Sequence, residues 1–226
     1  MARKSVFTVS RDIIDGGLIP VFYNGNVEAA INIVKACYDG GAKTVEFTNR
    51  GAHAYDVFND LSAFQQENLP GVHLGAGTIM DLATAAQYIN AGAAFIVSPT
   101  FSIDVARVCN RRRILYIPGC QTPTEISTAE EAGCNLVKLF PANVLTPNFI
   151  KALMGPMPQT QLIPSGGVKV EHENIAAWIG SGAVALNIGS ELIRKDLVES
   201  GKFDVITENV KQCITWIRES RKNQRT

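Results

Sequence analysis

Short apolar runs alternate with longer segments of helical spacing along the whole chain. Eight such runs, rich in β-branched and aliphatic residues, recur within its 226 residues. They are nearly continuous in apolar character rather than strictly alternating, which favours strands of a parallel sheet covered on its outer side. We expect strands at residues 18–23, 43–48, 71–76, 94–99, 114–119, 135–140, 161–166 and 183–189.

The segments between the runs have the pattern of amphipathic helices. In NVEAAINIVKACYDGG (26–41), apolar side chains recur at helical intervals and a Gly-Gly pair ends the pattern. DLATAAQYINAGA (81–93) and TPTEISTAEEAGC (122–134) repeat this form, each opening on a capping residue and closing near a glycine. Eight such units in about 200 residues predict an α/β protein with a (β/α)8 TIM barrel, near the short end of that fold's range. A doubly wound open sheet is the alternative, but short and similar crossovers favour closure.

We expect one domain over residues 1–226. Residues 1–17 precede the first strand, and SRDIIDGG (10–17) is interpreted as a helical cap that closes the bottom of the barrel. Residues 203–220 are expected as the outer helix after the eighth strand, and residues 218–226 as a frayed, charged tail. The run NRRR (110–113) is expected at a helix end, where cations favour the helix dipole, rather than in a nucleic-acid patch.

Composition narrows the classes of function. The 21 basic and 21 acidic side chains cancel, so no global field would attract nucleic acid or an anionic membrane. Five scattered cysteines without a CxxC pair indicate free buried thiols in a reducing cytoplasm. The chain opens without a signal-peptide pattern, and no apolar run approaches the roughly 20 residues of a membrane span. The three histidines have no partner at metal-ligand spacing, so we expect no metal and no cofactor.

Polar residues where the runs end define the predicted site, because active sites in this architecture lie at the carboxyl ends of the strands. One mouth is expected to gather a lysine, a carboxylate, a guanidinium, a hydroxyl and two glycine loops. These residues are Lys138, Glu46, Arg50, Thr78, Ser165, Gly166, Gly167, Gly189 and Ser190.

Lys138 stands inside the apolar run LVKLFPAN (136–143). An ammonium is costly to bury unless it is paired or shifted toward its neutral form. Taken alone, a lysine in a strand is more often a sheet-edge or snorkelling residue. In a partly desolvated apolar site with Arg50 nearby, a lowered pKa would let the amine attack a ketone and form an iminium.

The other residues have matching chemistry. Glu46 is a candidate for moving protons, Arg50 offers a planar fork for a carboxylate, and Thr78 adds a hydroxyl. The two glycine loops follow strands seven and eight, where many barrels bind phosphate through backbone amides. Alternatively, Glu46 and Arg50 form a structural ion pair, and the glycines serve plain tight turns.

Several segments, taken in order, resemble a known family. They are GGAKTVEFTNRG, LGAGTI, FIVSP, IPGCQTPTEISTAEEAG, VKLFPAN and PSGGV, within a match from about Ile19 to about Leu192. Together the segments resemble the 2-keto-3-deoxy-6-phosphogluconate (KDPG) aldolases, which include bifunctional 4-hydroxy-2-oxoglutarate aldolases.

This resemblance implies a class I, metal-independent aldolase that cleaves KDPG to pyruvate and D-glyceraldehyde 3-phosphate, a reaction of the Entner–Doudoroff route. It implies that Lys138 forms the Schiff base, that Glu46 is the general acid and base, and that Arg50 anchors the carboxylate. It matches Thr78 to the family's G-x-G-T threonine, places Pro99 and Phe140 around the pyruvyl group, and places Gly166, Gly167 and Ser190 at the phosphate. It also implies a homotrimer.

The chain departs from the family pattern at several positions. Thr100 stands where many members have glycine, and Ser165 where threonine is usual. In LNIGSELI (186–193), members often have Gly-Gly-Ser-Trp. We therefore expect Asn187, Ile188 and Glu191 to reshape the phosphate end, with Glu191 repelling phosphate if it points inward.

Three other functions stay open. The same chemistry could act on 4-hydroxy-2-oxoglutarate, giving pyruvate and glyoxylate, or on another 2-keto-3-deoxy sugar acid. A phosphate-binding isomerase or epimerase would use Glu46 as a base without a covalent step. A non-catalytic barrel would bind pyruvate or a sugar phosphate without turnover. The fold alone does not separate these functions.

Overall fold

The computed structural model describes residues 4–223 and confirms the repeated strand–helix order. Each of the eight predicted runs forms a strand, and the fifth is divided into β5 and β6 by Pro118. The strands are β1 Leu18–Phe22, β2 Thr44–Thr48, β3 His73–Gly77, β4 Phe95–Val97, β5 Leu115–Ile117, β6 Gly119–Cys120, β7 Val137–Leu139, β8 Leu162–Pro164 and β9 Leu186–Ile188.

The helices begin where the capping residues predict. Asn26, Asp81 and Thr122 each accept a hydrogen bond from a backbone N–H of the first turn, and Thr122 forms a capping box with Glu125. The helices are α1 Val6–Gly16, α2 Val27–Asp39, α3 Ala54–Asn68, α4 Leu82–Asn90, α5 Ile103–Arg112, α6 Pro123–Glu131, α7 Pro147–Met154, α8 His172–Gly180, α9 Lys195–Glu199 and α10 Phe203–Asn223.

The parallel strands close into a barrel. Six of them pair in the order β5-β4-β3-β2-β1-β9, and three in the order β6-β7-β8. A bridge between Ser165 and Asn187 joins β8 to β9, and the chain itself joins β5 to β6. Pro118 has no N–H, but its carbonyl accepts a hydrogen bond from the Lys138 backbone at 2.8 Å. The expected (β/α)8 barrel is therefore confirmed, and the open-sheet alternative is wrong.

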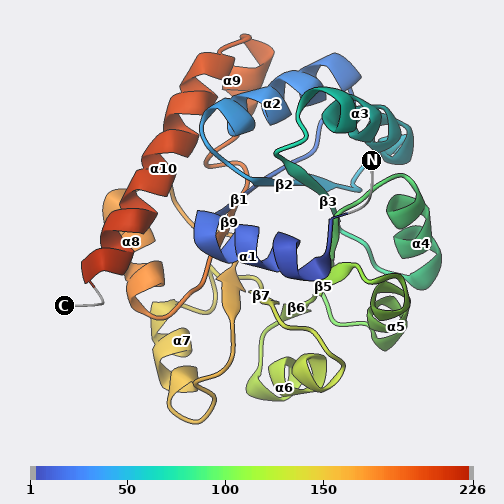
Figure 1. Cartoon of the computed structure of the whole chain (residues 1–226). Helices are drawn as coiled ribbons and strands as arrows, with labels where there is room; N and C mark the ends of the chain where they lie inside the picture. Colours follow the sequence, from blue (N-terminus) through green and yellow to red (C-terminus); the bar gives the residue numbers. More distant parts are fainter. Residues whose placement is uncertain (1–3, 224–226) are drawn as a thin grey trace.

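Helix α1 lies across the end of the barrel (Figure 1). Ser5 caps its start, and Gly17 ends it in the left-handed conformation at a φ of 73°. Its buried Val9 and Ile13 pack against inward-facing strand side chains, including Ile19 and Ile163. The helix that the sequence predicts before the first strand is therefore present, and it fills the amino end of the barrel.

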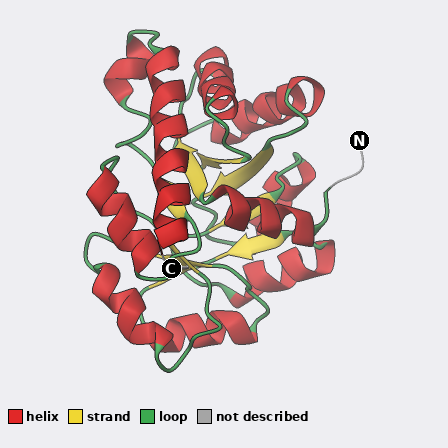
Figure 2. Ribbon diagram, turned by 60° about the vertical axis from the view of Figure 1, so that its left-hand side comes forward, coloured by secondary structure: helices red, strands yellow, loops and turns green. Residues whose placement is uncertain are grey.

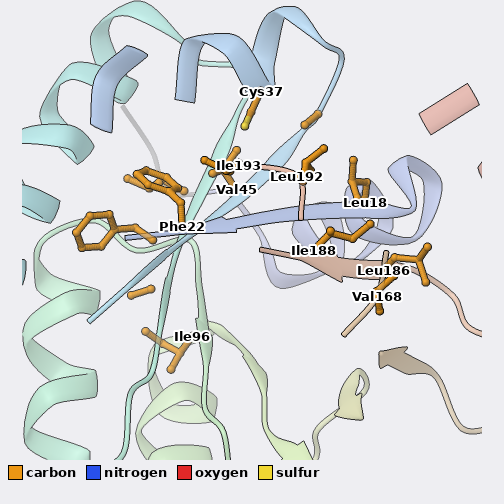
Figure 3. Close-up of a cluster of buried hydrophobic side chains, with 14 of the residues drawn as sticks. Leu18, Phe22, Cys37, Val45, Ile96, Val168, Leu186, Ile188, Leu192 and Ile193 are labelled. Atoms are coloured by element: carbon orange, nitrogen blue, oxygen red, sulfur yellow. The ribbon is translucent and has the colours of Figure 1, made fainter. Parts of the chain in front are cut away.

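The strands alternate between an outer and an inner face. Figure 2 shows the helices surrounding the strands. Leu18, Val45, Leu186 and Ile188 point into the layer between the two, as Figure 3 shows. Residues between these positions point inward because the side-chain period of a strand is two. The same alternation places Glu46, Lys138 and Asn187 inside the barrel.

The carboxyl-terminal helix is longer than expected. Helix α10 continues to Asn223, so residues 218–223 are helical rather than frayed, while residues 224–226 lie outside the described part. Its Arg221 guanidinium donates hydrogen bonds to the carbonyls of Ile14, Asp15 and Val184, which ties the helix to the bottom of the barrel. Arg111 and Arg112 occupy the last turn of α5, as expected.

Two further expectations concern the chain as a whole. The five cysteines are free and buried, and burial raises the pKa of each thiol to about 12. None of the helices within residues 4–223 combines the length and the apolar character that crossing a membrane would require.

Candidate active site

Lys138 lies in the middle of β7 and is only 7% exposed. Val137 and Leu139, its neighbours, point outward into the main core, so the lysine side chain points into the barrel. Burial lowers the pKa of its amine; the Glu46 carboxylate partly offsets this effect, and the Arg50 guanidinium adds to it. Within residues 4–223, no carboxylate forms an ion pair with Nζ, which lies 4.9 Å from the centre of the Phe140 ring.

Glu46, on β2, is buried and held by a chain of hydrogen bonds. The Asn187 amide Nδ2 donates to Glu46 Oε2 at 2.8 Å, and the Ser165 hydroxyl donates to Asn187 Oδ1 at 2.6 Å. Glu46 Oε1 lies over Gly77, where a Cβ would overlap it. The glycine of the GAGT segment therefore makes room for the carboxylate.

This network corrects the interpretation of two residues. The sequence predicts that Asn187 and Ile188 reshape the phosphate end of the site, but Asn187 contacts Glu46 deep in the barrel. Ile188 points away from the cavity into the outer core, beside Leu186 (Figure 3). Both side chains follow the alternation of β9, which the prediction did not apply to the end of the expected strand 183–189.

Arg50 and Thr78 meet at the mouth. The Arg50 Nε donates to the Thr78 hydroxyl at 3.5 Å. Thr78 has a φ of 61°, an uncommon conformation for a β-branched residue. Such strain is found most often at functional sites, and it directs this hydroxyl toward the guanidinium. The alternative of a Glu46–Arg50 ion pair is wrong, because no ion pair joins these two side chains.

A cavity of about 720 Å³ opens at the carboxyl ends of the strands. Its wall contains eight of the eleven residues that the sequence singles out, namely Arg50, Lys138, Phe140, Ser165, Gly166, Gly167, Gly189 and Ser190. Glu46 is not part of this lining, but its Oε2 accepts a hydrogen bond from Asn187, which is. Thr78 contacts Arg50 from the side, and Pro99 packs against Gly119 outside the lining.

The glycine loop after β8 offers unused donors. Gly166 and Gly167 have φ values of 81° and 90°, which only glycine adopts without strain. Among the described residues, nothing accepts a hydrogen bond from their N–H groups or from that of Ser190. These groups can bind an anion.

Ser165 differs from its neighbours in this loop. Its N–H donates to the Leu139 carbonyl and its hydroxyl donates to Asn187. Ser165 therefore has no donor left for an anion, contrary to the expectation that it helps to bind phosphate.

The cavity also contains residues that the sequence interpretation missed. Tyr23, Asn24 and Gly25 follow β1 and line one side, while Lys195 and Glu199 of α9 line another. The first three stand directly after a strand, so the rule that found Arg50 would have found them too. Asn187 carried the same signal as Lys138, a polar residue inside an apolar run.

A metal site needs a cluster of side chains that can bind the ion. Within residues 4–223, no group of three or more His, Cys, Asp or Glu side chains is placed to hold a metal ion. His73 instead shares a hydrogen bond with Asp12 at 2.8 Å, at the opposite end of the barrel.

Comparison with known proteins agrees with this site. The family model described as KDPG and KHG aldolase matches residues 9–209. The chain is 31% identical to the 2-dehydro-3-deoxy-phosphogluconate aldolase of Pseudoalteromonas atlantica over 91% of its length and 94% of that protein. It is 32% identical to the enzyme of the same name from Treponema pallidum over 87% of its length and 91% of that protein.

A solved structure supports the fold. The KDPG aldolase from Legionella pneumophila, crystallised with pyruvate captured as a covalent carbinolamine intermediate, superposes with a TM-score of 0.78 at 23% identity. The match covers 88% of this chain and 96% of that one. The chain thus belongs to the KDPG and KHG aldolase family, and it is a carbon–carbon lyase.

Proposed function

We propose that this protein is a class I aldolase in which Lys138 forms a Schiff base with a 2-keto acid. The observation that carries the proposal is a buried amine that faces the cavity without an ion-pair partner among the described residues. Burial lowers the pKa of this amine, so a larger fraction is the neutral nucleophile at neutral pH. The covalent carbinolamine seen in the Legionella pneumophila enzyme is consistent with the same chemistry here.

The neighbouring residues supply the other steps. The Arg50 fork binds the substrate carboxylate and so turns the ketone toward Nζ, with Thr78 holding the guanidinium. Glu46 moves the protons of carbinolamine dehydration and takes the proton of the aldehyde-side hydroxyl when the carbon–carbon bond breaks. The bond's electrons pass into the iminium, giving an enamine that becomes pyruvate after protonation and hydrolysis.

We propose KDPG as the substrate, with pyruvate and D-glyceraldehyde 3-phosphate as products. The free N–H groups of Gly166, Gly167 and Ser190 suit the phosphate at the far end of this keto acid. The names of both relatives above agree with this choice.

A second candidate substrate carries no phosphate. Glu191 and Glu199 line the far part of the cavity, and Lys195 is paired with Glu199 at 3.5 Å. These carboxylates disfavour a dianion and favour an unphosphorylated 2-keto-3-deoxy sugar acid. 4-Hydroxy-2-oxoglutarate contains the same pyruvate half and would give pyruvate and glyoxylate. It is the third candidate substrate.

The test is borohydride reduction with pyruvate, followed by mass spectrometry of the intact chain and its peptides. We expect a pyruvyl adduct on the peptide that carries Lys138, and none in Lys138→Ala. The kcat/KM values for the three substrates then select the aldehyde. Folded protein without an adduct, or Lys138→Ala that keeps its activity, would contradict the Schiff-base mechanism and favour an isomerase, an epimerase or a binding protein.

We also propose a homotrimer that works in the cytoplasm within the Entner–Doudoroff route. Exposed Met80, Leu82 and Ile103 follow β3 and β4 and suit a contact between subunits. The buried, unpaired thiols suit a reducing compartment. Light scattering after size-exclusion chromatography would test the trimer, because a monomer near 24.4 kDa would contradict it.

A further inference from the structure

Asn187 holds a position that the proposed chemistry has not yet used. It lies on β9 and is 3% exposed, and its amide is satisfied on both sides. Nδ2 donates to Glu46 Oε2, and Oδ1 accepts from the Ser165 hydroxyl. Because a carboxylate can only accept, the amide nitrogen faces Glu46, and Oδ1 therefore faces the Ser165 hydroxyl, which donates to it.

The two oxygens of Glu46 are consequently unequal. Oε2 is occupied by Asn187, and this is the only hydrogen bond that a described residue makes to the carboxylate. Oε1 rests over the Cα of Gly77, with no hydrogen-bond donor from residues 4–223. The Asn187 donor and the close approach of Gly77 together hold the plane of the carboxylate, with one oxygen bound and the other free.

Building on the proposed function, we infer that Asn187 is a positioning residue that holds Oε2 and leaves Oε1 as the oxygen that carries the proton. Asn187 itself touches no reacting atom. It acts through Glu46, and Ser165 acts through Asn187. Ser165 lines the cavity beside the glycine loop, so the hydrogen-bond chain that holds Glu46 begins at the cavity wall.

The step that depends on this orientation is proton removal from the pyruvyl iminium. A C–H bond of the methyl group breaks, and its electron pair forms the C=C bond of the enamine. The iminium π electrons move onto the Lys138 nitrogen and neutralise it. The proton goes to Glu46 Oε1, which becomes a carboxylic acid while Oε2 keeps the hydrogen bond from Asn187. The reverse transfer regenerates the iminium, so no other reactant is required.

The exchange of pyruvate methyl protons with D₂O, followed by NMR, measures this step. Borohydride trapping at equilibrium measures the fraction of Schiff base separately. For Asn187→Leu we expect exchange at least about 100-fold slower, with an unchanged trapped fraction and little change in the KM for pyruvate. Exchange within about threefold of the unchanged protein would overturn the inference.

Asn187→Asp separates positioning from packing. The carboxyl that this substitution introduces can donate to Oε2 only while it shares a proton with Glu46. The nearby cations Lys138 and Arg50 favour loss of that proton. We expect exchange in this variant to fall as the pH rises and the shared proton leaves, whereas Asn187→Leu stays slow at every pH. If Asn187→Asp is as slow as Asn187→Leu across the whole pH range, a carboxyl that can share a proton does not replace the amide donor, and the inference that the Oε2 hydrogen bond positions Glu46 is wrong.

Ser165→Ala and Ile188→Val complete the series. Losing the hydroxyl frees the amide without removing it, so we expect a smaller slowing, about three- to tenfold. Ile188 is the next residue on the same strand but points into the outer core, so its variant controls for altered packing of β9 and is expected to exchange at the normal rate. Unchanged protein that traps no pyruvate would instead overturn the proposed function, and with it this inference.

Discussion

The two ends of the barrel treat buried ionisable groups in opposite ways. At the amino end, His73 is 2% exposed and is hydrogen-bonded to Asp12 of α1, which also pairs with Lys43 at 3.5 Å. At the carboxyl end, Lys138 is similarly buried but has no ion pair within the described chain. A similar depth of burial thus accompanies a hydrogen-bonded cluster at one end and an amine without an ion-pair partner at the other.

The difference separates stability from reactivity. A buried group with a hydrogen-bonded partner recovers part of the solvation that it loses, so Asp12 offsets part of the cost of burying His73 and ties α1 to β3. A buried amine without one shifts toward its neutral form, which costs folding free energy and makes a nucleophile. Substitutions at the two ends should therefore move activity and stability in different proportions.

Lys138→Met should give the largest effect and separate the two properties most clearly. We expect kcat/KM for cleavage to fall at least about 10³-fold, because the nucleophile is lost. The free energy of unfolding should rise by about 1–3 kcal/mol at neutral pH, because a buried unpaired amine is replaced by an apolar side chain of similar size.

Urea unfolding across a pH series checks the sign of that gain. The folded pKa of Lys138 lies below its usual value of about 10.4, so the unfolded chain binds a proton that the folded chain binds less readily. The cost of burying Lys138 to the free energy of folding is therefore present below that pH and is lost above it. The advantage of Lys138→Met should shrink as the pH rises toward it. A variant less stable than the parent at neutral pH would contradict the contrast between the two ends.

Gly77→Ala should impair the site by displacing Glu46 while every reacting group stays present. A Cβ here would overlap Glu46 Oε1, so the carboxylate must move, and we expect kcat to fall about 100-fold. Gly180→Ala is the matched control, because a Cβ at that position meets nothing within 4 Å. Steady-state kinetics of both variants, with circular dichroism for folding, would test this; equal kcat values would show that Glu46 tolerates displacement.

His73→Ala should reverse the pattern seen at Lys138. Loss of the ring leaves Asp12 without its buried partner and opens space beneath α1, so we expect unfolding to become easier by about 2–3 kcal/mol. The kcat of the folded enzyme should not change. Lys43→Ala is the control, because its side chain is 53% exposed and its pair with Asp12 is worth at most about 0.5 kcal/mol. A fall in the kcat of folded His73→Ala would contradict the prediction, because it would show that the amino end of the barrel influences the active site.

The Asp12–His73 hydrogen bond should make stability depend on pH, with a smaller effect than the substitutions above. Burial lowers the pKa of His73, and the Asp12 hydrogen bond only partly offsets this. Between that folded value and about 6.5, the unfolded chain binds more protons, so stability is complete above pH 6.5 and decreases as the pH falls below it. In His73→Gln, which cannot titrate, thermal melts should show a flatter pH dependence in this window, and an equally steep one would assign the effect to other groups.

Glu191→Gln should give the smallest change. Glu191 is an exposed side chain on the cavity wall, so removing its charge should lower the KM for a phosphorylated substrate only about two- to threefold. Added salt should diminish the difference. Glu131→Gln, on α6 outside the cavity, is the control. No change for the phosphorylated substrate would mean that Glu191 does not face the phosphate.

Local sequence patterns predicted most of the fold and much of the site. Strand positions, helix caps and the inward lysine depend on periodicity over a few residues, and a parallel barrel brings every strand end to one mouth. The same reasoning extended to β1 would have found Tyr23 and Asn24. It failed for Ile188, because the alternation was not applied at the carboxyl end of the expected strand 183–189, where this side chain points outward.

The repeating units, the nucleophile and the family segments can be recognised without a structure, since they are properties of short stretches of chain. The hydrogen-bond partners depend on the closed barrel. Asn187 and Glu46 are 141 positions apart and meet because β9 and β2 flank β1 in the closed ring. The hydrogen bond between Asp12 and His73 likewise forms only once α1 covers the barrel. A side chain's face is set by its neighbours in the chain, whereas its hydrogen-bond partner is set by which strands the closure brings together.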